Sequence, residues 1–202
     1  MLASGAIKEK ILHKALENAV FDGWNNTMLE ASAAMAGIEK KAAYIYFSTG
    51  ISSLVDFFAE ENLIELEKAA LHLPHDKKLP EKISWLIMEY FKAAGKNQAA
   101  IKKLMSYYAM PQNMPHGLRN LHRLVDKIWR LSGDESTDFS YYTKRFSLST
   151  IYSETLLFWL GDNSQDFKAT EAFLKRKIGN LMKFHKAKAE IKGIVRKLAG
   201  RN

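Results

Sequence analysis

The chain has 202 residues, 47% of them hydrophobic, which is enough for one well-filled domain or at most two small ones. It contains no cysteine, which excludes disulfides and thiol chemistry and favours a reducing compartment. The net charge is +8, but residues 175–202 hold ten Lys and Arg against one Glu, and the preceding 174 residues hold 20 basic and 21 acidic side chains. The basicity is therefore a property of the C-terminal tail.

The first residues predict an amphipathic helix with no long apolar run and no small-residue cleavage site, so no signal peptide is expected. Glu9 and the absence of Arg from this segment argue against a transit peptide. Apolar residues recur at helical spacing over residues 5–20, and a turn follows at Asp22 and Gly23.

Two short helices are expected next. Asn26 or Thr27 can cap a helix that ends near Met35, and Gly37 separates it from another short helix over residues 38–47. A long fourth helix is predicted over residues 51–73. A long helix followed by two short ones around a glycine turn is a helix-turn-helix outline.

A linker over residues 74–80 precedes a second helical block. Helices are predicted over residues 81–92, 98–108 and 118–131, with Pro111 and Pro115 ending the second of them. Thr137 or Asp138 can cap a further helix that runs to Leu160. Because Glu154 is the only charged residue between Phe146 and Leu160, we expect this helix to be central and covered on nearly all sides. It is too short to span a bilayer, which takes roughly 20 apolar residues.

Methionine and aromatic residues form a stripe across the second block, and two interpretations stay open. The stripe is either ordinary core packing or the lining of a cavity for an apolar ligand. Its members are Trp85, Met88, Phe91, Met105, Tyr108, Ile128, Trp129, Phe146 and Tyr152.

Catalytic signatures are missing from the sequence. It has no HExxH or ExxH pair, no GxSxG elbow, no P-loop and no GxGxxG. The six histidines lie among Lys and Arg without ligand spacing, so solvated surface positions are expected for His13, His72, His75, His116, His122 and His185. We predict a protein that is not an enzyme and holds neither a metal nor a cofactor.

Residues 37–47, GIEKKAAYIYF, resemble the recognition-helix segment of TetR-type repressors, whose aromatic residues pack at the positions of Tyr44, Tyr46 and Phe47. Only Lys40 and Lys41 could neutralise phosphate there, and Glu39 would repel it. DNA binding is therefore the less favoured interpretation, and retention of the fold without repressor function is preferred.

A second resemblance rests on longer motifs. Residues 133–145, GDESTDFSYYTKR, followed by Ile151-Tyr152 and by residues 162–167, DNSQDF, are similar to the hallmark region of the coenzyme Q nine family of ubiquinone biosynthesis accessory proteins. The resemblance extends to residues 21–24, FDGW, and 111–113, PQN. Gln165 stands where the family often has Pro, and Glu171 where it often has Trp, which leaves an aromatic partner contact at 171 in doubt.

This resemblance implies an all-α, TetR-like helical bundle with an N-terminal helix-turn-helix unit and a C-terminal amphipathic helix. It also implies a bound isoprenoid or quinone-like lipid, namely a polyprenyl quinone intermediate or a phospholipid, presented to a di-iron demethoxyubiquinone hydroxylase. A homodimer through the last long helices is typical of the fold. The expected location is the bacterial cytoplasm, peripheral to the inner membrane, or the matrix side of a mitochondrial membrane if a transit peptide has been removed.

Two sets of residues follow from this interpretation. The expected lipid lining is Trp85, Met88, Phe91, Met105, Tyr108, Ile128, Trp129, Tyr142, Phe146, Ile151, Tyr152 and Leu156. The expected helix caps and partner-facing surface are Asp134, Ser136, Thr137, Asp138, Arg145, Asp162, Ser164, Asp166, Phe167 and Phe173.

The basic tail supplies a membrane-binding prediction. At about 100° per residue, the apolar side chains of residues 184–198 fall within one arc of roughly 100°, and Lys and Arg fill the rest. This pattern is typical of a helix in the interface of an anionic membrane, although a solvated basic end or apolar contact with the body is the alternative. The predicted membrane contacts are Phe184, Lys186, Lys188, Ile191, Ile194, Val195, Arg196, Lys197 and Leu198.

The predicted organisation is one structural domain in three parts. Residues 1–73 form the N-terminal three-helix unit plus a linking helix, residues 74–183 the lipid-binding and dimerisation helices, and residues 184–202 the basic tail. Three functions are carried forward: a lipid-presenting accessory protein, a TetR-type DNA-binding regulator and a plain helical scaffold.

Overall fold

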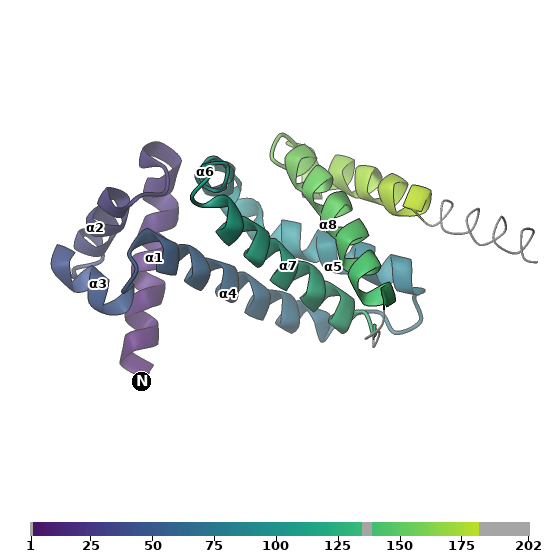
Figure 1. The fold of residues 1–202 in the computed structure, drawn as a ribbon, viewed down its shortest axis with the longest axis horizontal. Helices are drawn as coiled ribbons and strands as arrows, with labels where there is room; N and C mark the ends of the chain where they lie inside the picture. The colour runs from purple at the N-terminus through teal and green to yellow at the C-terminus, as the bar shows by residue number, and fades with distance from the viewer. Residues whose placement is uncertain (1, 135–138, 182–202) are drawn as a thin grey trace, which may run out of the picture.

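The computed structural model describes residues 2–134 and 139–181, and these residues contain helices and turns but no strand. The first three helices are α1 (Leu2–Asp22), α2 (Asn26–Met35) and α3 (Ala43–Tyr46), with the short 3-10 turn η1 (Lys40–Ala42) before α3. They pack together at one end of the molecule (Figure 1). This is the predicted helix-turn-helix unit, although the expected helix over residues 38–47 divides into η1 and α3.

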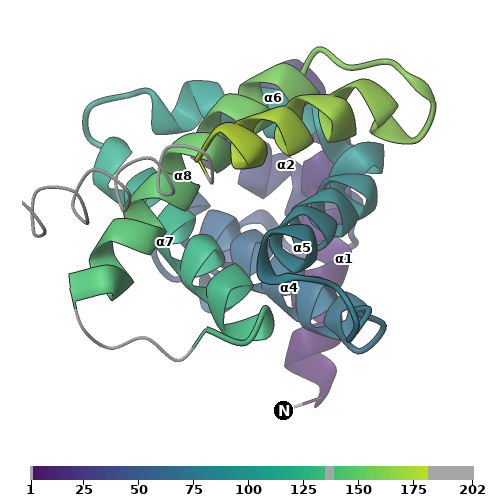
Figure 2. The same cartoon turned by 90° about the vertical axis from the view of Figure 1, so that its right-hand side faces the viewer.

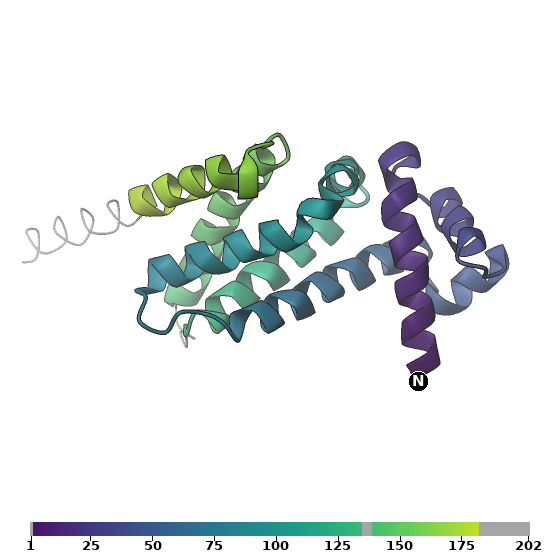
Figure 3. The same cartoon turned by 180° about the vertical axis from the view of Figure 1, so that it is seen from behind.

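Helix α4 (Ile51–Ala70) runs from this unit along the body, which contains α5 (Leu79–Ala94), α6 (Gln98–Tyr108) and α7 (Met114–Leu131). Helix α8 (Phe139–Trp159), the 3-10 turn η2 (Gly95–Asn97) and the 3-10 turn η3 (Gln165–Phe167) complete the named elements, and residues 168–181 are helical. Seen from behind, α4 links the N-terminal unit to the rest of the bundle (Figure 3). The all-α, TetR-like bundle predicted from the sequence is confirmed.

Two prolines lie inside first turns, where a missing N–H costs nothing because no intrahelical acceptor exists there. Pro80 stands in the first turn of α5, and Pro115 in the first turn of α7. Both helices therefore begin earlier than the sequence pattern predicted. The predicted caps of α2, Asn26 and Thr27, are wrong by one or two positions: the N-cap is Asn25, whose side chain accepts from the Met28 backbone N–H at 2.9 Å.

The N-terminal unit is held to the body through Trp24. The indole of Trp24 is buried, donates to the Ala100 carbonyl on α6 at 2.9 Å, and stacks on Phe58 of α4 with 5.7 Å between ring centroids. A buried indole N–H needs such a partner, because an unpaired donor would cost about 1–3 kcal/mol. This contact fixes α4 and α6 relative to each other.

Ion pairs join α4 to α7 along their length. Arg123 pairs with Glu60, Lys127 pairs with Glu67, and Asp56 meets both His116 and Arg119. Nε2 of His116 lies 2.6 Å from Oδ1 of Asp56, and only 10% of the His116 side chain is exposed. The prediction that His116 is a solvated surface residue is therefore wrong, because Asp56 offers it a partner and the rings of Tyr107 and Tyr108 cover it.

Helix α8 is not covered on all sides within the single chain, which corrects another expectation. Leu148, Ile151, Tyr152, Thr155 and Trp159 are buried on one face of this helix, and α8 packs beside α7 (Figure 2). Tyr142, Phe146 and Leu157 are exposed on the opposite face, and Phe158 is 40% exposed at its edge. Counting charges along the sequence could not separate these faces, since both are apolar.

Candidate functional site

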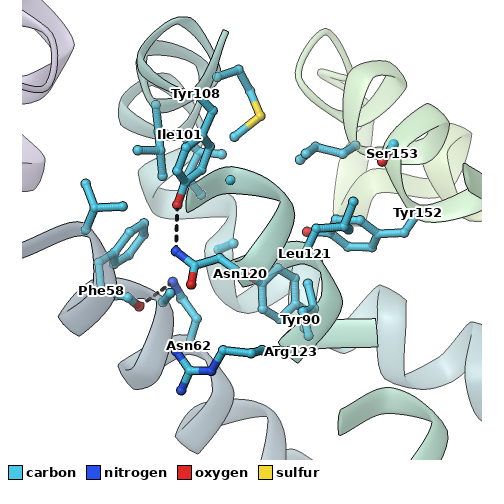
Figure 4. A pocket seen from close by; sticks show the side chains of 18 of the residues that line it. Phe58, Asn62, Tyr90, Ile101, Tyr108, Asn120, Leu121, Arg123, Tyr152 and Ser153 are labelled. Carbon is cyan, nitrogen blue, oxygen red and sulfur yellow. Dashed lines mark hydrogen bonds between the residues drawn. The ribbon is translucent and has the colours of Figure 1, made fainter. Parts of the chain in front are cut away.

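A cavity of about 260 Å³ lies between α4, α5, α6, α7 and α8, and its walls are mostly apolar. Five helices reach it because each turns one buried stripe toward the centre of the bundle (Figure 4). The volume is near the lower end of the roughly 300–1,000 Å³ typical of small-molecule sites. The lining residues are Val55, Phe58, Ala59, Asn62, Leu63, Tyr90, Phe91, Ala94, Ile101, Leu104, Met105, Tyr108, Met114, Gly117, Leu118, Asn120, Leu121, Arg123, Leu124, Tyr152, Ser153, Leu156 and Trp159.

Aromatic rings form one wall. Phe91 of α5 stacks on Tyr152 at 5.5 Å and on Trp159 at 5.1 Å between ring centroids, and all three side chains are buried. Tyr90 meets both Phe91 and Tyr152 edge-on, at 6.1 and 6.2 Å. Such pairs contribute about 0.5–1.5 kcal/mol each beyond their buried area, so this wall is rigid.

A small number of polar groups interrupt the apolar lining. Nδ2 of Asn120 donates to the Tyr108 hydroxyl at 3.1 Å, and Nδ2 of Asn62 donates to the Phe58 carbonyl at 2.8 Å (Figure 4). Oδ1 of Asn120 is shielded from solvent and has no hydrogen-bond partner among the described residues. A buried acceptor without a hydrogen-bond partner lowers the stability of the fold by about 1–3 kcal/mol.

Burial also changes the acidity of the tyrosines around the cavity. It raises the pKa of Tyr90 to about 12, although a hydrogen bond with Tyr152 works in the opposite direction. Burial likewise raises the pKa of Tyr108 to about 12 and the pKa of Tyr152 well above its usual value. All three hydroxyls therefore stay protonated at neutral pH and can donate hydrogen bonds.

The cavity opens to solvent beside the first turns of α7. Met114 and Leu118 line it and are also exposed, with 49% and 59% of their surface accessible. Met110, in the turn before α7, is exposed as well. Rim side chains of this kind offer an apolar chain apolar contacts at the opening, although the charged residue Arg123 also lines the cavity.

Five of the twelve predicted lipid-lining residues stand on the cavity wall: Phe91, Met105, Tyr108, Tyr152 and Leu156. Trp85 and Met88 line a separate groove between α5 and residues 171–179. Ile128, Trp129 and Ile151 are buried in the core away from the cavity. Tyr142 and Phe146 are 70% and 76% exposed on the outer face of α8, so the structure places them outside the cavity.

Sequence reasoning missed several wall residues. Phe58 and Asn62 belong to α4, which the sequence assigned to the N-terminal unit rather than to the site. Asn120 could have been identified from the sequence, because it directly precedes Leu121, a member of the apolar face predicted for this helix. An amide at the edge of a buried stripe indicates either a hydrogen-bonded core or a polar point in a cavity.

The predicted partner-facing residues divide into groups. Asp134 and Arg145 are each 4% exposed and bind each other at 2.9 Å, and Arg145 also binds Asp126 at 2.9 Å. Burial lowers the pKa of Arg145, but the hydrogen bonds of Asp134 and Asp126 outweigh it and raise that pKa overall. These two residues hold α7 to α8 and present no exposed surface, contrary to expectation.

Asp162 is buried too, and it works as a cap. Its carboxylate accepts from the Ser164 and Thr170 backbone N–H groups at 2.8 Å each, and from the Thr170 hydroxyl at 2.6 Å. Burial raises the pKa of Asp162, but these hydrogen bonds outweigh it and leave the pKa below its ordinary value. The carboxylate fixes the start of the helix over residues 168–181.

The remaining predicted partner residues differ in exposure. Asp166 is exposed, Phe167 packs on Trp159 with 5.6 Å between ring centroids, and Phe173 stacks on Phe158 at 4.6 Å. Glu171 binds Lys175 at 2.6 Å on the outside of the same helix.

Several predicted residues lie outside the described part of the chain. These are the partner candidates Ser136, Thr137 and Asp138, and the membrane candidates Phe184, Lys186, Lys188, Ile191, Ile194, Val195, Arg196, Lys197 and Leu198. Within the described residues, no group of three or more His, Asp or Glu side chains is arranged to hold a metal ion. None of the described helices has the length and hydropathy to cross a membrane.

Comparison with a solved structure identifies the fold. The crystal structure of a TetR transcriptional regulator from Nitrosomonas europaea superposes with a TM-score of 0.69 over 86% of this chain and 97% of that one, at 22% sequence identity. Because the identity is this low, the likeness concerns the fold alone. The helix-turn-helix unit and the bundle body correspond in order to the predicted TetR-like architecture.

Comparison with known sequences identifies relatives. The chain is 30% identical to the mitochondrial ubiquinone biosynthesis protein COQ9 of Rattus norvegicus over 200 residues, and 28% identical to that of Homo sapiens over 200 residues. In both cases 90% of this chain is covered, and the chain spans about three fifths of the relative's length, 61% and 60%. The COQ9 protein of Schizosaccharomyces pombe is 28% identical over 174 residues.

The COQ9 family model matches residues 114–185, which include α7, α8 and the helix that follows them. This region provides one wall of the cavity and the buried Asp126–Arg145–Asp134 cluster. The predicted resemblance to the coenzyme Q nine family is therefore confirmed: residues 114–185 match the family model, and the described residues have a TetR-like fold.

Proposed function

We propose that this chain is a lipid-binding accessory protein of ubiquinone biosynthesis that is not itself an enzyme. In this proposal it holds a polyprenyl quinone intermediate in the cavity between α4, α5, α6, α7 and α8. The observation that carries the proposal is a mostly apolar cavity with an apolar rim, in a chain similar over most of its length to proteins named for ubiquinone biosynthesis.

The cavity suits an apolar chain on energetic grounds. Transfer of apolar surface out of water stabilises a complex by about 25 cal/mol per Å². An isoprenoid tail in a bilayer is already free of water, so a protein must offer a comparably dry environment to extract it. Phe91, Met105 and Leu156 provide such an environment, and flexible Met side chains adapt to an irregular chain.

The volume of about 260 Å³ limits how much of the ligand fits. It is close to the size needed for a ring and a short piece of tail. The rest of a long tail would leave past Met114 and Leu118, whose exposed side chains continue the apolar path. The proposal therefore places the ring inside and the tail toward the opening.

We further propose that the chain presents this lipid to a di-iron demethoxyubiquinone hydroxylase at a membrane surface. The sequence of residues 184–202, with its apolar arc and its Lys and Arg, supports attachment to anionic lipid. The expected location is accordingly peripheral to the bacterial inner membrane or on the matrix side of a mitochondrial membrane. The relatives from Rattus norvegicus, Homo sapiens and Schizosaccharomyces pombe are named as mitochondrial proteins.

A homodimer through α8 and the helix after it forms part of the same proposal. Tyr142, Phe146 and Leu157 place three large, exposed side chains on one face of α8, and Phe158, at the edge of this face, stacks on Phe173. Exposed apolar patches can mark a protein or membrane contact, which supports this part of the proposal. By contrast, a DNA-binding regulator rests on the fold alone, since α2 contains no Lys or Arg and η1 contributes only Lys40 and Lys41.

The proposal is tested by extracting lipid from the purified 202-residue chain and measuring it by mass spectrometry. A pair of variants on one helix makes the test specific: Ser153→Phe fills the cavity, whereas Ser149→Phe places the same ring one turn away, off the cavity wall. Bound isoprenoid is expected in the wild type and in Ser149→Phe, and its loss is expected in Ser153→Phe. Equal lipid in all three proteins, or none in the wild type, contradicts the proposal.

A further inference from the structure

Two cavity-lining residues carry a buried polar atom that has no hydrogen-bond partner among the described residues, Asn120 Oδ1 and Trp159 Nε1, and of the two only the Asn120 side chain is hydrogen-bonded to a second polar side chain of the wall. Tyr108 on α6 and Asn120 on α7 both line the cavity, and Nδ2 of Asn120 donates to the Tyr108 hydroxyl at 3.1 Å (Figure 4). That contact uses one N–H donor of the Asn120 amide and one acceptor site of the Tyr108 hydroxyl oxygen. Oδ1 of Asn120, an acceptor, is left without a partner among the described residues.

The Tyr108 hydroxyl adds a donor at the same place. It accepts from Asn120, and its own hydrogen is engaged in no hydrogen bond within the described residues that would occupy it. Burial raises the pKa of Tyr108 to about 12, so this hydrogen is retained at neutral pH. Tyr108 and Asn120 together therefore offer one donor and one acceptor side by side.

A hydroxyl is the group that matches this pair. It can accept from the Tyr108 O–H and donate to Asn120 Oδ1, which closes a ring of three hydrogen bonds with the existing Asn120–Tyr108 contact. A carbonyl or an ether oxygen can only accept. With either of these in place, Asn120 Oδ1 would stay buried and unpaired.

Flat aromatic surface lies in the same cavity. Tyr90, Phe91 and Tyr152 are stacked or edge-on to one another, and all three line the wall. A planar ring in the cavity can pack against such faces with geometry like that of the aromatic pairs already present. The tail of the same molecule would then run toward Met114 and Leu118.

We infer that Tyr108 and Asn120 form a head-group subsite that selects prenylated aromatic rings with a free hydroxyl, a phenol or hydroquinone, over rings whose oxygens only accept. This inference rests on the proposed function and deepens it, because it states which end of the lipid lies deepest and which chemical state is preferred. Sites built to bind a ligand hydroxyl discriminate strongly against analogues that lack it.

The test compares two ligands that differ by one methyl group. A prenylated phenol and its phenolic methyl ether are titrated into the delipidated 202-residue chain in the same nonionic detergent, with binding followed by calorimetry. We expect the wild type to bind the phenol about tenfold more tightly than the ether. Asn120→Leu removes the acceptor and is expected to bind the phenol and the ether with similar affinity. A preference that came only from the size of the methyl group would persist in this variant, so the two causes can be told apart.

Two further variants make the result unambiguous. Tyr108→Phe removes the donor and is also expected to reduce the preference, which keeps the inference testable if Asn120→Leu does not fold. Trp129→Phe removes another buried unpartnered polar atom, Nε1, that lies away from the cavity wall, and it should keep the wild-type preference. The inference is contradicted if the wild type binds both ligands tightly without preference, or if the preference survives in Asn120→Leu. Either result leaves the proposed function standing. Failure of the wild type to bind either ligand overturns the proposed function as well.

Discussion

Nε2 of His116 lies 2.6 Å from Oδ1 of Asp56 and joins the start of α7 to α4, next to the cavity wall. Burial raises the pKa of Asp56, but the hydrogen bond and charge of His116 and the charge of Arg119 outweigh it and leave the pKa below its ordinary value of 3.8. A carboxylate with a lowered pKa stabilises the fold above its unfolded-state pKa, and that contribution is lost as the pH falls through the folded value.

Asp56→Asn should therefore destabilise the protein at neutral pH and make little difference in acid. Because Asp56 is partly exposed, the expected loss at pH 7 is about 1 kcal/mol or less. Urea unfolding of wild type and variant at pH 7 and at pH 3 measures this. The difference between the two free energies of unfolding should be smaller at pH 3 than at pH 7, and an equal difference at both values would refute the assignment.

Gly95 lies directly against the ring of Phe167. A Cβ built at Gly95 would approach Cε2 of Phe167 to 2.7 Å, and Phe167 is held against Trp159 in a backbone conformation with φ of 55°. Gly95→Ala is expected to lower stability by about 1–2 kcal/mol, since overpacking outweighs the gain of about 1 kcal/mol in helix propensity.

The matched control for Gly95 is Gly179→Ala, where a Cβ would meet nothing within 4 Å. That change should leave the melting temperature unchanged or raise it slightly. If thermal unfolding shows the same effect for both substitutions, the contact between Gly95 and Phe167 does not constrain the fold.

Arg145 is the most deeply buried cation of the described residues, with Asp126 and Asp134 as partners. Removing one member of a buried ion pair leaves an uncompensated charge and costs about 3–5 kcal/mol. Arg145→Ala is expected to lose stability of that order. Arg130→Ala, which removes an exposed partner of the same Asp126, should cost less than about 1 kcal/mol by chemical denaturation.

Phe146 tests the exposed face of α8. In the proposed homodimer this ring is covered by the second copy, so Phe146→Asp should shift sedimentation toward the monomer at micromolar concentration. Phe21→Asp changes a ring that is 82% exposed at the far end of α1, and it should leave the assembly unchanged. A wild type that sediments only as monomer, or equal behaviour of the two variants, would argue against a dimer through α8.

Much of the fold could be predicted from the sequence because helix periodicity, caps and glycine turns act locally. The helix-turn-helix outline and the order of the helices followed from such signals. The faces of α8 did not, because Phe146 and Tyr152 are equally apolar and only the packing of other helices decides which is covered.

The site was predicted in part. Phe91, Met105 and Tyr152 lie on the wall as expected, since a stripe of large residues pointed to the bundle centre. The contributions of Phe58 and Asn62 could not be foreseen, because they depend on how α4 crosses the body. The burial of Asp134 and Arg145 was missed for a related reason: a charged residue in a motif gives no indication of its partner across the bundle.

The proposed lipid-binding cavity is tested most directly by a crystal structure of this 202-residue chain with a prenylated hydroquinone brominated on its ring. If the ring lies inside, an anomalous bromine peak is expected in the cavity beside Phe91, Tyr108 and Tyr152, with the tail directed toward Leu118. A peak only at the groove between α5 and residues 171–179, on the outer face of α8, or nowhere, would contradict the proposal.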